Sequence, residues 1–107
     1  MSRFTWAAPA ALSFAALSLA APCAMAQDAN LARNLAATCT NCHGTQGQSR
    51  GEVKSLAGLP AESIVAAFNG YKAGTIPATV MHQIAKGYTD EQIKLVAAYF
   101  AAQQPRK

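Results

Sequence analysis

The chain has 107 residues, with nine basic and five acidic side chains and three cysteines. This length allows one small domain at most. The basic residues are scattered along the chain, which excludes the clustered positive surface of a nucleic-acid-binding protein. The modest positive charge suits docking to an acidic partner protein and, equally, an ordinary soluble surface.

Residues 1–26 have the pattern of a secretory signal peptide. Arg3 supplies a positive start, an uncharged alanine-rich run follows, and the Ala-Met-Ala motif at 24–26 is a small-x-small cleavage site. An uncleaved membrane anchor is the alternative, because no charge lies between Arg3 and Asp28. Two prolines and the alanine content favour cleavage. We therefore predict export to the periplasm, a mature domain at 27–107, and no stable membrane insertion.

The first predicted helix begins near Asp28 or Asn30, either of which is a suitable cap, and runs toward Cys39. Leu31 and Leu35 lie four residues apart and form one apolar edge. We expect this edge to hold the following segment against the core.

The segment from Cys39 to His43 reads Cys-Thr-Asn-Cys-His. In an exported protein this pattern is the attachment signature of a c-type haem, in which both thiols add to haem vinyl groups and the histidine ligates the iron. On a helical turn, Cys39, Cys42 and His43 share one face. We predict one covalent haem c, with thioethers at Cys39 and Cys42 and with His43 as an axial iron ligand. Such a group would also fill a core that is marginal at this size.

Three other uses of these residues fit the sequence less well. A redox-active dithiol normally follows a strand, and no strand pattern precedes Cys39. A zinc site needs four ligands, and adjacent Cys42 and His43 are awkward at a tetrahedral ion. A plain disulfide would not require His43. In an oxidising compartment, haem attachment explains why the two thiols persist.

Residues 44–58 are rich in glycine, serine and glutamine, which predicts a loop. We expect it to pass on the His43 side of the haem, where a backbone carbonyl accepts a hydrogen bond from the other imidazole nitrogen. No proline occurs between His43 and Pro60, so the sequence does not identify this carbonyl.

A second helix is predicted from Pro60 to about Lys72, closing at Gly74. Pro60 suits a first helical position and Glu62 a first turn. Apolar residues then follow at spacings of three and four: Ile64, Val65, Phe68 and Tyr71.

Met81 is the only methionine that remains once the signal peptide is removed. It follows an irregular connection that contains Pro77 and precedes a short turn ending at Gly87. A lone methionine usually fills a core. Its position, well downstream of the attachment motif, favours a second axial ligand, and His/Met ligation raises the reduction potential. The neighbouring His82 competes for this role, and we expect it instead at the solvated surface.

The last helix is predicted from a capping box at Thr89-Asp90-Glu91-Gln92. Its inward face is traced by four apolar residues: Ile93, Val96, Ala97 and Phe100. The first and last helices could then cross and clamp the cofactor.

The order of these features resembles the small monohaem class I cytochromes c of bacteria, over essentially all of 27–103. The resemblance implies an all-α fold of three to five short helices wrapped around one covalently attached haem. It also implies thioethers at Cys39 and Cys42, and His43 and Met81 as the axial ligands.

A narrower similarity is carried by Cys-His-Gly-Thr-Gln-Gly at 42–47, Leu-Ala-Gly at 56–58 and the stretch 81–100. These segments resemble the cytochrome subunit of sulfide dehydrogenase, a flavocytochrome c. This resemblance implies an FAD-containing sulfide dehydrogenase subunit as the partner that donates electrons.

The resulting hypothesis is one-electron transfer in the periplasm by a protein that is not itself an enzyme. A free shuttle to an oxidase or dehydrogenase is the alternative within this class. A small haem peroxidase and a haem-based gas sensor are alternatives from other classes, and a retained Met81 ligand argues against both.

Overall fold

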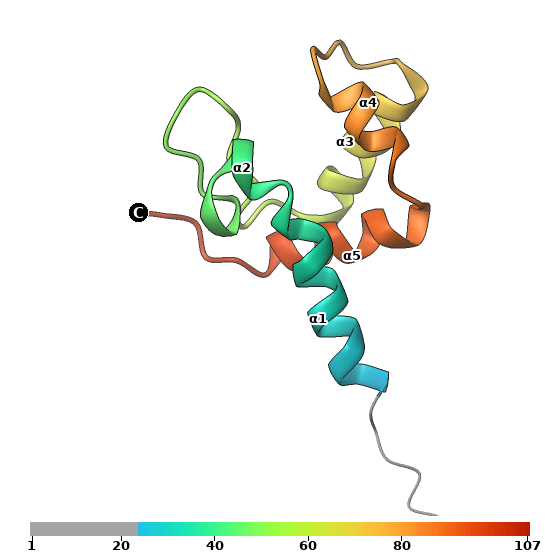
Figure 1. Ribbon diagram of the computed structural model, residues 1–107. Helices are drawn as coiled ribbons and strands as arrows, with labels where there is room; N and C mark the ends of the chain where they lie inside the picture. Colours follow the sequence, from blue (N-terminus) through green and yellow to red (C-terminus); the bar gives the residue numbers. More distant parts are fainter. Residues whose placement is uncertain (1–23) are drawn as a thin grey trace, which may run out of the picture.

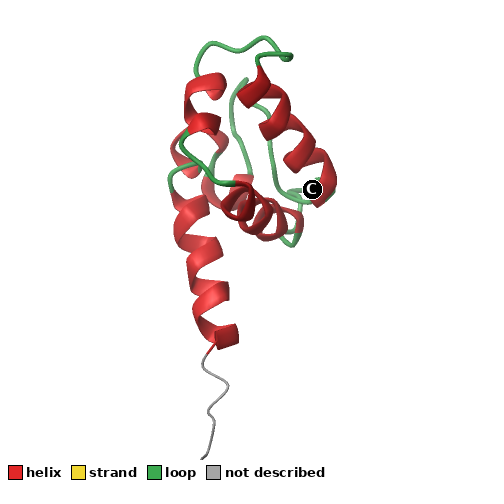
Figure 2. Ribbon diagram, turned by 90° about the vertical axis from the view of Figure 1, so that its right-hand side faces the viewer, coloured by secondary structure: helices red, strands yellow, loops and turns green. Residues whose placement is uncertain are grey.

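The computed structural model describes residues 24–107, with side chains described from residue 30 onward. All regular elements in this range are helical, which confirms the predicted all-α class (Figures 1 and 2). Their bounds are α1 Ala24–Ala37, α2 Thr40–His43, the 3-10 turn η1 Thr45–Gly47, α3 Ala61–Ala73, α4 Met81–Lys86 and α5 Asp90–Ala101.

Helix α1 begins earlier than the sequence predicted. It starts at Ala24 rather than near Asp28 or Asn30, and it ends at Ala37. The alanine-rich start explains the difference, because alanine has the highest helix propensity and needs no capping side chain to continue a helix. The last three residues of the predicted signal peptide therefore lie in α1, and the rest of that segment lies outside the described residues.

Helix α3 begins at Ala61, one residue after the predicted start, and ends at Ala73, one residue after the predicted end. Pro60 is its N-cap, Glu62 lies in its first turn, and Gly74 ends it in the left-handed conformation at φ 76°. Glycine adopts this conformation without the steric cost that a Cβ brings. Ile64 and Phe68 are buried, as expected for the inward face.

Helix α5 starts at the predicted capping box. The Thr89 hydroxyl accepts a hydrogen bond from the Gln92 backbone N–H, and the Gln92 side chain accepts one from the Thr89 N–H. The four residues predicted for its inner face are all buried: Ile93, Val96, Ala97 and Phe100.

The core forms where α5 meets α1 on one side and α3 on the other (Figure 1). Helix α4 packs on α3, so α3 and α4 form one arm beside α5, and α1 with α2 forms the other. The fully buried side chains include Phe100, Ile93 and Val96 of α5. Burying side chains of this size stabilises the fold by about 1.5–3 kcal/mol each.

The loop at 44–58 is tied to α5 by its backbone. The Gly47 carbonyl accepts hydrogen bonds from the N–H groups of Leu56 and Ala57, and the Gly58 N–H donates to the Phe100 carbonyl at 3.0 Å. Gly47 has φ 75°, and a Cβ there would come within 2.7 Å of the Phe100 ring. This close approach requires glycine.

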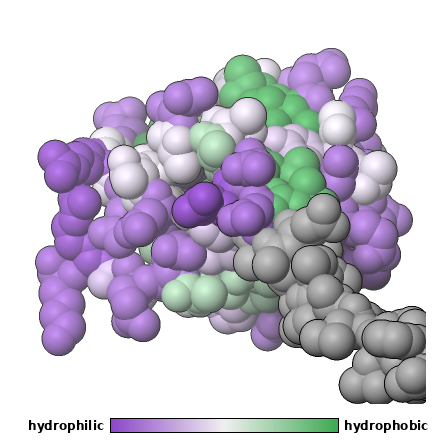
Figure 3. All heavy atoms as spheres, turned by 60° about the horizontal axis from the view of Figure 1, so that its bottom comes forward, coloured by the Kyte–Doolittle hydropathy of each residue, from purple (hydrophilic) through white to green (hydrophobic). Residues whose placement is uncertain are grey.

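Hydrophilic residues cover much of the face shown in Figure 3, with hydrophobic residues gathered toward one side of it. Within residues 24–107, no helix combines the length and the apolar character that crossing a bilayer requires.

We expect Thr89→Ala to lower the free energy of unfolding by about 1 kcal/mol, because it removes the acceptor for the Gln92 N–H. Denaturant unfolding of the haem-loaded protein measures this loss. Thr45→Ala is the matched control, because Thr45 is exposed and its hydroxyl has no hydrogen bond within the described range. Equal losses in the two variants would contradict the capping role.

Candidate haem attachment site

The attachment motif forms one compact turn. Cys39 is the N-cap of α2, and its carbonyl accepts hydrogen bonds from the N–H groups of Cys42 at 3.3 Å and His43 at 2.9 Å. These bonds place Cys39, Cys42 and His43 on one helical face, as predicted. Cys39 is half-buried against the core, whereas Cys42 is exposed. No disulfide joins the two sulfurs.

The His43 ring is oriented by a backbone carbonyl. Its Nδ1 lies 2.6 Å from the carbonyl oxygen of Lys54. Because a carbonyl only accepts, Nδ1 carries the hydrogen, and Nε2 is left with the lone pair that a metal needs. The prediction that the loop at 44–58 supplies this carbonyl is confirmed, and the structure identifies it as Lys54.

Gly44 shapes the chain directly after His43. It has φ 84° and ψ 163°, and its N–H donates to the Thr40 carbonyl at 3.0 Å. A Cβ on Gly44 would overlap the backbone carbonyl of Gln48. The turn that leads from His43 into the loop therefore needs a residue without a side chain.

Met81 lies on the other arm, as the first residue of α4, and packs half-buried against the core. Figure 1 shows α4 and α2 on opposite sides above the meeting point of α1 and α5. The structure thus brings Cys39, Cys42 and His43 together in one turn and places Met81 on the other arm, at the start of α4.

The prediction of a solvated His82 is wrong. The side chain is half-buried, and its Nδ1 is buried without a hydrogen-bond partner among the described residues. The reason is that α4 begins at Met81, where the sequence indicated only a short turn. Successive helical side chains point about 100° apart, so Met81 and His82 face different directions.

Burial raises the pKa of the Cys39 thiol above its ordinary value, and the hydroxyl groups of Thr38 and Tyr88 act in the opposite direction. Tyr88 lies almost fifty residues away in the sequence. Nothing in the sequence pattern signals that its hydroxyl lies 2.8 Å from that of Thr38, the residue before Cys39.

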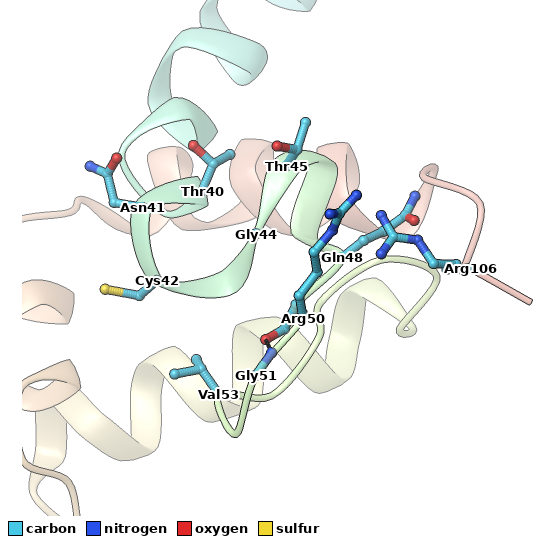
Figure 4. A pocket seen from close by; sticks show the side chains of 11 residues that line it. Thr40, Asn41, Cys42, Gly44, Thr45, Gln48, Arg50, Gly51, Val53 and Arg106 are labelled. Atoms are coloured by element: carbon cyan, nitrogen blue, oxygen red, sulfur yellow. Dashed lines mark hydrogen bonds between the residues drawn. The ribbon is translucent and has the colours of Figure 1, made fainter.

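A hollow of about 360 Å³ lies beside the attachment turn. Arg50, Arg106 and Gln48 line it, and Figure 4 shows their side chains directed to the same region. The Cys42 sulfur points away from these residues. Cys42 nevertheless lines the hollow, together with its neighbours Thr40 and Gly44.

The donor set fits haem c. Two thiols and one oriented imidazole lie in a single turn, and a thioether side chain lies on the facing arm. On the α4 side, the Nδ1 of His82 is buried and has no hydrogen-bond partner among the described residues. No group of three or more His, Cys, Asp or Glu residues could hold a metal ion within residues 24–107, so the protein alone offers no zinc cluster there.

Comparison with characterised proteins identifies several cytochromes c. The chain is 44% identical over 66 residues to the cytochrome subunit of sulfide dehydrogenase from Chlorobaculum tepidum, covering 62% of this chain and 60% of that protein. It is 37% identical over 71 residues to cytochrome c-553 of Desulfomicrobium norvegicum, covering 64% of this chain and 89% of that protein. It is 32% identical over 83 residues to cytochrome c-554(548) of Halomonas halodenitrificans, covering 74% of this chain and all of that protein. No protein-family model matches the chain.

The helical fold and the attachment turn define a small haem-binding electron carrier. With the identities above, the chain belongs to the small class I cytochromes c. It is therefore an electron-transfer protein that carries covalently bound haem c.

We expect Gly44→Ala to lower the free energy of unfolding by about 1–3 kcal/mol or more, because the new Cβ meets the Gln48 carbonyl in a left-handed backbone. Denaturant unfolding of the haem-loaded variant measures the loss. Gly51→Ala is the matched control, since a Cβ there has no neighbour within 4 Å and φ is not positive. A Gly44 variant as stable as the Gly51 variant would contradict this account of the turn.

Proposed function

We propose that this chain is a periplasmic one-electron carrier in which Cys39 and Cys42 hold haem c through thioethers, with His43 and Met81 as the axial iron ligands. The observation that carries the proposal is the attachment turn itself, with the His43 Nδ1 held 2.6 Å from the Lys54 carbonyl. When bound, haem c supplies an iron that changes by one electron.

The protein residues supply attachment and orientation. The turn fixes both sulfurs and the imidazole relative to one another, because three backbone hydrogen bonds close it. The Lys54 carbonyl selects the tautomer in which the Nε2 lone pair is free to bind the iron. On the facing arm, the soft thioether of Met81 favours ferrous iron and so raises the reduction potential.

We further propose that the electron donor is an FAD-containing sulfide dehydrogenase subunit. Support comes from the relative in Chlorobaculum tepidum, whose name states that it is the cytochrome subunit of such an enzyme. The matched region spans 60% of the length of that relative. The flavin subunit would oxidise sulfide, and this chain would accept the electrons one at a time.

Met81→Ala tests the distal ligand. We expect the ferric protein to lose the weak long-wavelength band that arises from charge transfer between sulfur and iron, and its reduction potential to fall, because the thioether no longer stabilises ferrous iron. The haem should stay attached under denaturing conditions, since Cys39 and Cys42 are unchanged. Optical spectra and a redox titration provide the measurement.

His82→Ala is the discriminating variant for the same experiment. It should keep the long-wavelength band, because His82 points away from the direction of Met81. Loss of the band in the His82 variant, or its retention in the Met81 variant, would refute the ligand assignment.

Affinity purification of the tagged chain from its native host tests the partner. We expect an FAD protein to copurify, and sulfide to reduce the cytochrome in the complex but much more slowly in the isolated chain. The cytochrome could instead purify alone and exchange electrons at full rate with an oxidase or another dehydrogenase. That result would identify a free shuttle.

A further inference from the structure

The two arms of the fold meet on α5 (Figure 1). Helix α1 packs against α5, whereas α4 packs against α3, which in turn packs against α5. No comparable packing joins α1 or α2 directly to α3 or α4 among the described helices. Met81 begins α4 on one arm, and the attachment turn begins at Cys39 on the other. The separation of these two residues therefore depends on any contact that crosses between the arms.

Tyr88 makes such a contact. It lies two residues after the end of α4, and its backbone N–H donates to the Ala85 carbonyl of that helix at 3.2 Å. Its phenolic oxygen lies 2.8 Å from the Thr38 hydroxyl and 3.4 Å from the Leu35 carbonyl oxygen, near the end of α1. Because Thr38 directly precedes Cys39, the Tyr88 hydroxyl joins the end of α4 to the start of the attachment turn.

The rest of Tyr88 is held by α3 and the start of α5. Its ring meets the Phe68 ring edge to face, with centroids 5.7 Å apart. Its backbone carbonyl accepts a hydrogen bond from the Lys72 ammonium at 3.0 Å, and the same ammonium pairs with Asp90 at 3.4 Å. These contacts fix the ring on the arm that contains α4, while the hydroxyl reaches the other arm.

We propose that Tyr88 is a positioning residue whose hydroxyl, bonded to Thr38, ties the two arms together and so opposes displacement of the Met81 thioether from the iron. This inference rests on the proposed function, in which Met81 is an axial ligand. An added ligand such as imidazole binds this iron only when the thioether leaves it and the arms separate. Separation breaks the bond between the two hydroxyls, so the open form is a minor state, and the apparent affinity for imidazole falls with its population.

Tyr88→Phe in the haem-loaded protein is the test, because it keeps the ring that packs on Phe68 and removes the hydroxyl alone. We expect the ferric variant to bind imidazole about two- to tenfold more tightly than the wild type does, the range that corresponds to one ordinary hydrogen bond. An optical titration measures this affinity through loss of the sulfur-to-iron charge-transfer band. Equal affinities in the variant and the wild type would overturn the proposal.

Tyr99→Phe is the matched control. Tyr99 is also half-buried and has an aromatic neighbour, and no hydrogen bond joins its hydroxyl to another residue within 24–107. Its affinity for imidazole should equal that of the wild type. A gain as large as that of the Tyr88 variant would count against a specific tie.

Thr38 variants test the other end of the same bond. Thr38→Val should increase the affinity for imidazole in the same direction, and Thr38→Ser, which keeps a hydroxyl, should retain the wild-type value. The double variant Tyr88→Phe with Thr38→Val should gain less than the product of the two single gains, since both substitutions break one bond. Independent effects that simply multiply would contradict the pairing.

A merely structural role for Tyr88 predicts lower stability with an unchanged affinity for imidazole. Ile93→Val provides the comparison, because Ile93 is fully buried in α5 and loss of one methyl group there lowers stability without removing the Tyr88 hydroxyl. We expect its affinity for imidazole to stay at the wild-type value. Tighter binding in this variant too would show that general loss of stability releases the thioether.

The wild-type protein separates failure of this inference from failure of the proposed function. If its denatured mass shows no attached haem, or if its ferric spectrum lacks the sulfur-to-iron band before imidazole is added, the proposed function fails. If haem is attached, the band is present and the affinity for imidazole ignores Tyr88, this inference alone fails.

Discussion

The hydrogen bond between His43 and the Lys54 carbonyl connects the two parts of the structure on which the site depends. On one side is the turn that carries both cysteines, and on the other is the loop at 44–58. Within that loop, the Gly47 carbonyl accepts hydrogen bonds from N–H groups near the C-terminal end of the same loop. The Gly58 N–H donates to the Phe100 carbonyl of α5. The orientation of one imidazole is therefore set by the helix that forms the centre of the core.

The core is small, and much of its packing comes from residues of modest size. Ala36 of α1 and Ala97 of α5 are fully buried, as is Ala85 of α4. Small side chains allow helices to approach closely, while Phe100 and Phe68 are the largest side chains of the buried core. A domain of this kind gains stability from a large covalent cofactor, which is consistent with membership of the cytochrome c family.

Local patterns in the sequence were sufficient to predict most of the helical architecture. The capping box at Thr89, the proline and glycine that bound α3, and the Cys-x-x-Cys-His turn each depend on residues within about five positions of one another. The start of α1 was missed because its alanine run continues into the predicted signal peptide. The burial of His82 was missed because α4 begins without a capping side chain.

The features that could not be predicted are contacts between distant segments. The sequence implies that some carbonyl holds His43, but the choice of Lys54 depends on the path of the loop over α5. The approach of Tyr88 to Thr38 joins residues fifty positions apart, and it depends on how α1 packs against α5. No short-range sequence pattern predicts either contact.

The anchoring of the loop on α5 also bears on the speed of electron exchange. A ligand that shifts when the charge of its metal changes slows the reaction, because its surroundings must rearrange before each transfer. With the proposed ligation, the ring of His43 is held by a backbone group whose segment is itself bonded to a buried helix, so little nuclear rearrangement accompanies oxidation or reduction. Under that ligation, a low reorganisation energy would follow from a loop that, in sequence, has the composition of a flexible linker.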